Sequence, residues 1–415
     1  MDVCVVGAGP AGVAAAVHLA RARREVLLVD RARFPRDKCC GDGLTTGALR
    51  LLEDLGFDPG ATPGWKAVAD VVVRGPAGHV TTFGLPRHRG TYAAVVPRFE
   101  LDAALVDLAR AEPGVEVAEG QACTGARVED GRVVLDIAGR GPVAARWAVG
   151  ADGTWSPLRK ALAGRAGAGG GGGGGGGSVE LGEWHAFRQY FSGVGPRAAE
   201  ELHVLFEPDL LPGYAWSFPL AGGRANVGFG IRRGGPVATR AMARLWPELL
   251  ARPHVRAVLG PGAVPEGTHK AWPIPARIRA IALSAAGGRA LFVGDAAAAT
   301  DPLTGEGIGQ ALLTGELAAR AIAGAGDDPA SAAARYAASV RRELAPDAAL
   351  SSLLTGAVRH RRGVRAGLRV AGATGWTRRN FARWLFEDYP RAYLATPGRW
   401  REHSLIGPGA YADHP

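Results

Sequence analysis

The sequence lacks the features that mark several large classes of protein. Its 415 residues contain no uninterrupted apolar segment close to the roughly 18 residues that span a bilayer. The N-terminus also lacks the charged-then-apolar pattern and the small-residue cleavage site of a secretory signal. We therefore expect a cytoplasmic globular protein, either soluble or associated with a membrane surface.

Cysteine is scarce. Cys4, Cys39, Cys40 and Cys123 show no metal-ligand spacing and suggest no disulfide framework, and the adjacent pair could bridge only under strain. A reducing compartment and the absence of a metal site are the expectations.

Lysine is equally scarce, so arginine supplies almost all of the basic charge behind a net charge of +10. Hydrophobic residues make up 47% of the chain and charged residues 21%, which is typical of a globular protein. A net positive charge is compatible with binding to acidic partners but does not identify one. Because no recognition motif accompanies the charge, we expect no nucleic-acid partner.

The first thirty residues predict a βαβ unit. Residues 2–6 form a short apolar run suited to a buried parallel strand, and residues 13–24 form an alanine-rich helix. A second apolar run over residues 25–29 ends at Asp30. Nucleotide-binding sheets begin with this arrangement.

The motif Gly7-x-Gly9-x-x-Gly12 joins the first strand to the helix. The first glycine permits the tight turn, the second lets a pyrophosphate approach the backbone, and the third lets helix and strand pack closely. The helix N-terminus offers free N–H groups and a positive dipole end to the phosphates. Asp30 is placed to accept hydrogen bonds from ribose hydroxyls, so the sequence predicts a dinucleotide site.

The later part of the chain returns to a βα pattern. Residues 291–293 predict a strand that runs into Gly294 and Asp295, and an aspartate there can accept a hydrogen bond from a ribityl hydroxyl. The following loop contains Gly305, Gly307 and Ile308, and its glycines allow the backbone to approach a flat ligand.

Two further motifs are weak when taken singly. Arg98 opens a helix expected over residues 99–110, and Gly150-Ala-Asp152-Gly153 ends a strand that starts at Trp147. Each one alone fits a helix cap or a surface ion pair, but the four motifs together, in this order, are informative.

Together the four motifs resemble the aromatic-hydroxylase-like superfamily of FAD enzymes. Within it, Phe34-Pro-Arg-Asp-Lys-Cys-Cys-Gly-Asp-Gly-Leu44 is similar to the Lys-x-Cys-Gly-x-Gly-Leu loop of the geranylgeranyl reductase family, which includes menaquinone side-chain reductases. The segments Pro302-Leu-Thr-Gly-Glu-Gly-Ile308 and Tyr214-Ala-Trp-Ser-Phe-Pro219 match two further stretches of that family. Cys39 and Asp42 depart from its usual pattern.

The resemblance implies a reductase that delivers a hydride from bound FAD to a carbon–carbon double bond of a prenyl chain. It implies FAD contacts for Gly7, Gly9, Gly12, Asp30, Arg98, Asp295, Gly305, Gly307 and Ile308. It places Cys40 near the flavin as a candidate proton donor or positioning residue, although bound water is an alternative donor. The electron donor would be NAD(P)H or a ferredoxin.

The resemblance also implies that Tyr214, Trp216 and Phe218 line a prenyl tunnel. Their alternation places all three rings on one face of a strand, which suits either an apolar ligand or an ordinary sheet core.

The expected fold class is α/β (α+β), with a Rossmann-like FAD-binding domain, an antiparallel-sheet substrate domain and a helical C-terminal region. The FAD-binding domain is expected over residues 1–160 and 270–330, with strand insertions at about 60–100. The substrate domain is expected over residues 178–270, after a glycine-rich flexible loop at 164–178, and the basic helical region over 331–415.

Residues 359–401 hold eleven arginines, two acids and several aromatics. This composition fits either a peripheral helix on anionic lipid or the solvated face of a helical cap. Two other functions stay open at this point: a flavin-dependent monooxygenase or halogenase on the same scaffold, and a flavoprotein that binds prenyl chains without reducing them.

Overall fold

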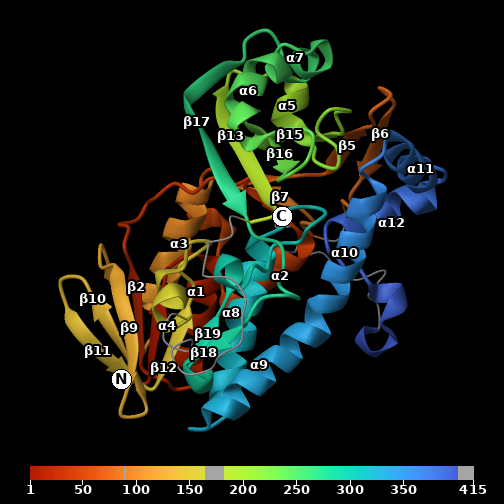
Figure 1. Ribbon diagram of the computed structural model, residues 1–415. Helices are drawn as coiled ribbons and strands as arrows, with labels where there is room; N and C mark the ends of the chain where they lie inside the picture. Colours follow the sequence, from red (N-terminus) through yellow and green to blue (C-terminus); the bar gives the residue numbers. More distant parts are fainter. Residues whose placement is uncertain (88–89, 164–181, 401–415) are drawn as a thin grey trace.

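The computed structural model describes residues 1–87, 90–163 and 182–400. The expected glycine-rich loop at 164–178 lies outside the described residues. The described chain is built around two large sheets, one near the N-terminus and one in the upper part of the view, with the C-terminal helices running along both (Figure 1).

The first large sheet has the order β18-β19-β12-β1-β2-β8, and only the β18–β19 pair is antiparallel. Its strands are β1 (Val3–Val6), β2 (Val26–Asp30), β8 (Val115–Glu119), β12 (Trp147–Gly150), β18 (Ser284–Ala285) and β19 (Ala290–Phe292). Strands β1, β2, β12 and β19 are short and fully buried, which is typical of parallel sheets covered on both faces.

Each face of this sheet has a different cover. Val3 and Val5 point into a core shared with helices α1 (Pro10–Arg21), α3 (Arg98–Ala111) and α8 (Ile308–Ala323). Cys4 and Val6 point to the other face, which is covered by a small antiparallel sheet and by α4 (Pro157–Ala163). The small sheet consists of β9 (Cys123–Glu129), β10 (Arg132–Ile137) and β11 (Gly141–Ala145).

The second large sheet has seven strands in the order β17-β13-β16-β15-β14-β5-β6. They are β5 (Asp70–Arg74), β6 (Val80–Gly84), β13 (Trp184–Ser192), β14 (Leu202–Leu205), β15 (Ala215–Leu220), β16 (Arg224–Arg232) and β17 (Val264–Ile274). Helices α5 (Pro196–Glu200), α6 (Met242–Leu250) and α7 (Pro253–Leu259) contribute to the core on one face.

One feature of this sheet differs from the expectation. Strands β5 and β6 fall within the insertions expected at about 60–100 in the FAD-binding domain. They belong instead to the second large sheet, because β5 pairs in parallel with β14 and β6 pairs with β5. The sheet is therefore antiparallel except at that pair, and the insertion extends the candidate substrate-side sheet.

A short three-stranded sheet and one helix lie between the two large sheets. The sheet has the order β3 (Gly43–Leu44), β7 (Ala94–Val95), β4 (Lys66–Ala67). Helix α2 (Thr46–Leu55) follows β3 and is capped by Thr45, whose hydroxyl accepts a hydrogen bond from the Ala48 N–H.

The described part of the chain ends in a helical region, as expected. It contains α9 (Pro329–Glu343), α10 (Ala345–Ala357), α11 (Arg361–Ala371) and α12 (Gly375–Leu385). Helix α9 contributes Tyr336 to the core below the parallel sheet, whereas α12 packs Phe381 against Phe83 of β6 with ring centroids 4.7 Å apart. In the described ranges, none of the helices has both the length and the apolar character needed to cross a membrane. The predicted fold class is confirmed.

Candidate functional site

A cavity of about 1020 Å³ runs from the parallel sheet to the C-terminal helices. It begins at the carboxyl ends of β1 and β2, where open α/β sheets bind their ligands. It passes the loops around residues 36–45 and 300–308 and ends among apolar side chains of β15, α10, α11 and α12. One continuous space therefore joins a nucleotide-type end to an apolar end.

The glycine turn after β1 brings backbone to the cavity wall. Gly7 has φ +103°, and a Cβ there would lie 2.3 Å from the carbonyl oxygen of Ala151. A Cβ at Gly12 would lie 1.8 Å from the carbonyl oxygen of Gly7. Gly9 is different: its φ is −78°, and the nearest atom to an added Cβ would be a guanidinium nitrogen of Arg36, 3.5 Å away. The first and third glycines thus have no room for a side chain, and the first and second line the cavity, whereas Gly12 does not.

Asp30 lies beside this turn at the end of β2. Its Oδ2 accepts a hydrogen bond from the Ala8 N–H and its Oδ1 accepts one from the Ala32 N–H, both at 2.8 Å. Each carboxylate oxygen keeps a second lone pair for a ligand. Asp30 lines the cavity and also braces the glycine turn.

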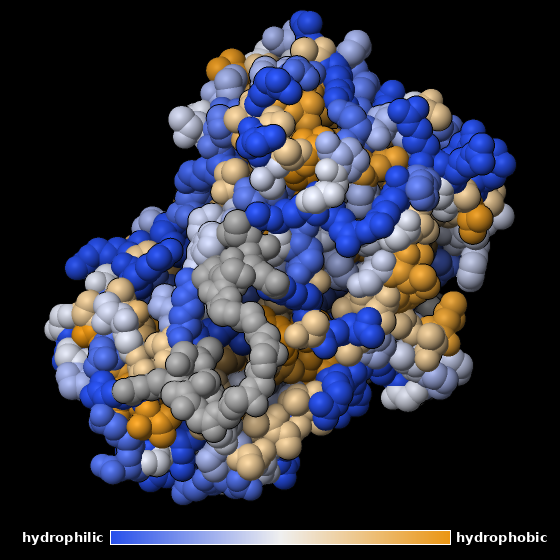
Figure 2. Space-filling view, in the orientation of Figure 1, coloured by the Kyte–Doolittle hydropathy of each residue, from blue (hydrophilic) through white to orange (hydrophobic). Residues whose placement is uncertain are grey.

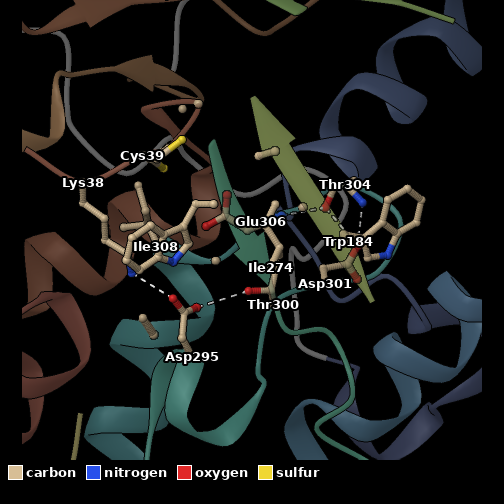
Figure 3. A pocket seen from close by; sticks show the side chains of 18 of the residues that line it. Lys38, Cys39, Trp184, Ile274, Asp295, Thr300, Asp301, Thr304, Glu306 and Ile308 are labelled. Carbon is tan, nitrogen blue, oxygen red and sulfur yellow. Dashed lines mark hydrogen bonds and ion pairs between the residues drawn. The ribbon is translucent and has the colours of Figure 1, made fainter. Parts of the chain in front are cut away.

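Asp295 follows β19 of the same parallel sheet and also lines the cavity, and Figure 3 shows the Lys38 side chain pointing to it. The Lys38 Nζ lies 2.8 Å from Asp295 Oδ2, and the Thr300 hydroxyl lies 3.5 Å from Oδ1. Burial acts to raise the pKa of Asp295, but the Lys38 ammonium, the Arg98 guanidinium and the Thr300 hydroxyl together outweigh it and hold that pKa below its usual value. The sequence motif contains Lys38, but sequence reasoning gave it no role.

Arg98 is almost fully buried, with 3% of its surface exposed. It donates two hydrogen bonds to Asp102, at 2.8 and 2.7 Å, and Arg36 forms a second ion pair with the same carboxylate. Burial raises the pKa of the Cys40 thiol, although the nearby Arg98 guanidinium acts in the opposite direction. Cys40 is therefore a protonated thiol at neutral pH.

Asp42 explains how the Cys40 loop is held. Its φ is +65°, and its buried carboxylate accepts hydrogen bonds from the Tyr190 hydroxyl at 2.6 Å and the Asn226 amide at 2.8 Å. The same amide nitrogen donates to the Cys40 carbonyl oxygen at 2.8 Å. Burial raises the pKa of Asp42 to about 6. Asp42, which departs from the family's usual pattern, thus holds the Cys40 loop against β13 and β16.

The three aromatics of the β15 segment line the cavity together. Neighbouring ring centroids are 6.3 Å apart for Tyr214 and Trp216, and 6.1 Å apart for Trp216 and Phe218. The Trp216 indole N–H donates to Asn226 at 3.1 Å, and the Tyr214 hydroxyl donates to the Thr304 carbonyl oxygen. The rings therefore border a hollow space, not a filled sheet core, and two of them are fixed by polar contacts.

The loop before α8 also faces the cavity. Gly305 has φ +71°, Gly307 precedes the helix and Ile308 begins it, and all three line the cavity. Glu306 lies between the two glycines, is 8% exposed, and accepts a hydrogen bond from the Gly309 N–H at 2.6 Å. Sequence reasoning quoted this loop but gave the carboxyl no function.

Sequence reasoning also missed the contribution of the C-terminal helices to the cavity. The apolar side chains that line its far end are Leu354, Val358, Val364, Leu368, Phe381 and Phe386. No local pattern shows that these helices fold back over the second sheet.

The nucleotide-type end fits FAD. The N-terminus of α1 has no capping side chain among the described residues, so its N–H groups are available to a pyrophosphate. Gly9 leaves room beside them, and Asp30 and Asp295, which follow β2 and β19 of the same sheet, offer carboxylate oxygens to the cavity.

Comparison with known proteins gives the same family. Residues 1–331 match the model of the FAD binding domain family. Menaquinone reductase of Mycobacterium tuberculosis is 34% identical over 346 residues, covering 77% of this chain and 76% of that protein. Digeranylgeranylglycerophospholipid reductase 1 of Methanopyrus kandleri is 31% identical over 333 residues, covering 76% of this chain and 79% of that protein.

A solved structure supports the fold. A geranylgeranyl bacteriochlorophyll reductase-like protein from Thermoplasma acidophilum superposes with a TM-score of 0.74 at 20% identity, over 96% of this chain and 99% of that one. The chain therefore binds FAD and belongs to the FAD-binding domain family, within the group of FAD-dependent reductases that includes the menaquinone and digeranylgeranylglycerophospholipid reductases.

Proposed function

We propose that this protein saturates carbon–carbon double bonds of a prenyl chain, either a geranylgeranyl group or a menaquinone side chain. The observation that carries the proposal is the continuous cavity, which joins the FAD-type end to an end walled by aromatic and aliphatic side chains. The names of the relatives supply the substrate class.

Bound and reduced FAD would supply the hydride. The chain's own residues bind and orient it: the α1 N-terminus and the Gly9 backbone at the pyrophosphate, Asp30 at the ribose, and Asp295 at the ribityl hydroxyls. Lys38 pairs with Asp295 across the site and contributes a positive charge. Arg98, buried against Asp102, holds the start of α3 beside the Cys40 loop.

The apolar end would bind the prenyl chain and exclude water from the reacting carbons. Tyr214, Trp216 and Phe218 form one wall, and α10–α12 form the other. Holding the alkene in a fixed position is the main contribution a protein makes to such a step. Cys40, at the junction of the two ends, positions the chain or donates a proton.

The function is tested by purifying the FAD-loaded protein, reducing it without oxygen, and offering geranylgeranyl diphosphate and menaquinone separately. The proposal expects a mass gain of two hydrogens per reduced bond on one of them. Unchanged mass with both, together with oxygen incorporation when air is admitted, would favour the monooxygenase or halogenase alternative. NADPH and reduced ferredoxin, supplied in turn, identify the electron donor.

We also propose that the α11–α12 surface contacts an anionic membrane. Val370 and Trp376 are 69% and 64% exposed. Exposed arginines flank them: Arg361, Arg362, Arg365, Arg369, Arg378 and Arg379. An apolar groove of about 520 Å³ lies between the two helices and shares Gly367, Phe381 and Trp384 with the main cavity.

Figure 2 shows hydrophobic side chains gathered on the side where α10 and α12 lie in Figure 1, with hydrophilic side chains around them. An apolar centre with a basic rim suits an anionic bilayer surface. Sedimentation with phosphatidylglycerol vesicles tests this. Binding should fall at least tenfold when Arg365 and Arg369 are changed to Glu, and equal binding by both proteins would exclude this surface.

A further inference from the structure

Glu306 is a buried carboxyl for which neither the FAD site nor the prenyl tunnel has a use. It lies in the middle of the pocket, between Cys39 on one side and Thr304 on the other (Figure 3). It therefore borders the space in which the FAD and prenyl ends of the cavity meet.

A second carboxyl, Glu387, lies behind it. Glu387 follows α12 and accepts hydrogen bonds from Thr45 at 3.1 Å, Gln310 at 3.0 Å and Arg391 at 3.0 Å. Its side chain is 14% exposed and Glu306 is 8% exposed, so Glu387 is the less buried of the two carboxyls. The Glu387 carboxylate is close enough to act on the charge of Glu306, which lines the cavity.

The charges around Glu306 favour its protonated form. Burial contributes most, followed by the nearby Glu387 carboxylate, and together they raise the pKa of Glu306 to about 8. Asp301 acts in the same direction, whereas the Gly309 N–H and the Arg391 guanidinium oppose it. Arg391 is itself engaged with Asp301 and Glu387. Glu306 therefore carries its proton at neutral pH.

Reduction of an isolated alkene needs a hydride on one carbon and a proton on the other. We propose, on the basis of the proposed function, that the Glu306 carboxylic acid gives this proton and that Glu387 returns one to it from solvent. The alkene π bond breaks, one carbon takes the hydride of reduced FAD, and the other takes the Glu306 proton. Glu306 is left as a carboxylate until it is reprotonated.

Cys40 is the competing donor. Burial raises the pKa of its thiol from an ordinary value that already exceeds that of Glu306 in this site. An acid whose pKa lies closer to the working pH transfers its proton more readily. Cys40 is then a residue that shapes the loop, and the comparison of C40S with E306Q separates the two roles.

The first test needs neither FAD nor substrate. Infrared difference spectra of the FAD-free protein, recorded from pH 6 to pH 10, should show a protonated-carboxyl C=O band that disappears with a midpoint near 8. The band should be absent in E306Q and present in C40S and in E316Q. Glu316 is a matched control because it is a buried glutamate of α8 that does not line the cavity. A band that survives in E306Q overturns the assignment.

Glu387→Gln provides a second variant if E306Q folds poorly. Removing the neighbouring negative charge should lower the midpoint of the band, and an unchanged midpoint would contradict the coupling. In turnover, E387Q should slow the steady state more than the first reduction event, because only reloading is impaired. If E387Q slowed only the first reduction event and left the steady-state rate unchanged, the role of Glu387 in reprotonating Glu306 would be refuted.

The last test uses the reduced holoenzyme in single turnover. E306Q should lower the rate by about 10²- to 10⁴-fold. The rate should fall above pH 8 in the wild-type protein and lose this dependence in E306Q, while E316Q behaves as wild type. An unchanged E306Q rate would refute the role of Glu306. A wild-type protein that reduces no prenyl chain would refute the proposed function instead, and with it this role, even if the infrared band is present.

Discussion

Gly9 offers a test of the cofactor site that separates binding from folding. Its φ of −78° suits any residue, and a Cβ there would meet only the Arg36 side chain, 3.5 Å away. Gly9→Ala should therefore leave the FAD-free protein as stable as wild type, or slightly more stable, since alanine restricts the unfolded chain. The added methyl group would stand where the backbone is expected to meet the pyrophosphate.

The size of the effect follows from the hydrogen bonds at stake. A bond from a backbone N–H to a charged group contributes about 1.5–3 kcal/mol. Because each 1.4 kcal/mol is tenfold in affinity, losing one such bond raises the Kd for FAD about 10- to 150-fold. Titration of FAD-free protein with FAD, followed by flavin fluorescence, measures this change.

Gly12→Ala is the contrasting variant. A Cβ at Gly12 would lie 1.8 Å from the Gly7 carbonyl oxygen, so helix and turn must move apart. This variant should lower the unfolding temperature of the FAD-free protein as well as the FAD affinity. Wild-type FAD affinity in Gly9→Ala would refute the placement of the pyrophosphate at this turn.

Three further predictions concern stability and substrate binding. Burial raises the pKa of Asp42 from 3.8 to about 6, so its ionisation destabilises the fold as pH rises from about 4 to 6. In denaturant unfolding, Asp42→Asn should therefore raise the free energy of unfolding by about 3 kcal/mol at pH 8 and by little at pH 4. An equal rise at both pH values would argue against this explanation. Phe218→Ala removes an aromatic ring from the cavity, and burying such a ring contributes about 1.5–3 kcal/mol. KM for the prenyl substrate should therefore rise about tenfold or more while FAD affinity is retained. A parallel loss of FAD affinity would contradict a role confined to the substrate. Arg98→Ala removes the two hydrogen bonds that Arg98 donates to Asp102 and leaves that buried carboxylate with the Arg36 ion pair alone, so it should cost about 1.5–3 kcal/mol. The double variant with Asp102→Ala should restore part of this loss, and a double variant less stable than Arg98→Ala would count against this explanation.

Local chemistry made part of the site predictable from the sequence. The glycine turn is recognisable because the backbone at Gly7 and Gly12 leaves no room for a side chain. The alternation of Tyr214, Trp216 and Phe218 placed their rings on one side of a strand, and all three line the cavity. Motifs whose residue types are dictated within a few positions can be read without a structure.

The unpredicted features depend on contacts between distant segments. Lys38 and Asp295 are separated by 257 residues, and the amide of Asn226 meets the Cys40 carbonyl oxygen across 186. Likewise, nothing near Glu306 in the sequence indicates that Glu387 will lie beside it. Such pairs are set by the way the two sheets and the C-terminal helices pack.

The central claim is that reduced FAD in this protein gives its hydride to a prenyl double bond. The most direct measurement is an anaerobic titration of the reduced holoprotein with menaquinone or geranylgeranyl diphosphate, in which flavin absorbance and product mass are followed together. The account predicts one flavin reoxidised for each pair of hydrogens gained by the prenyl chain. Flavin that stays reduced with both substrates until air is admitted would contradict it.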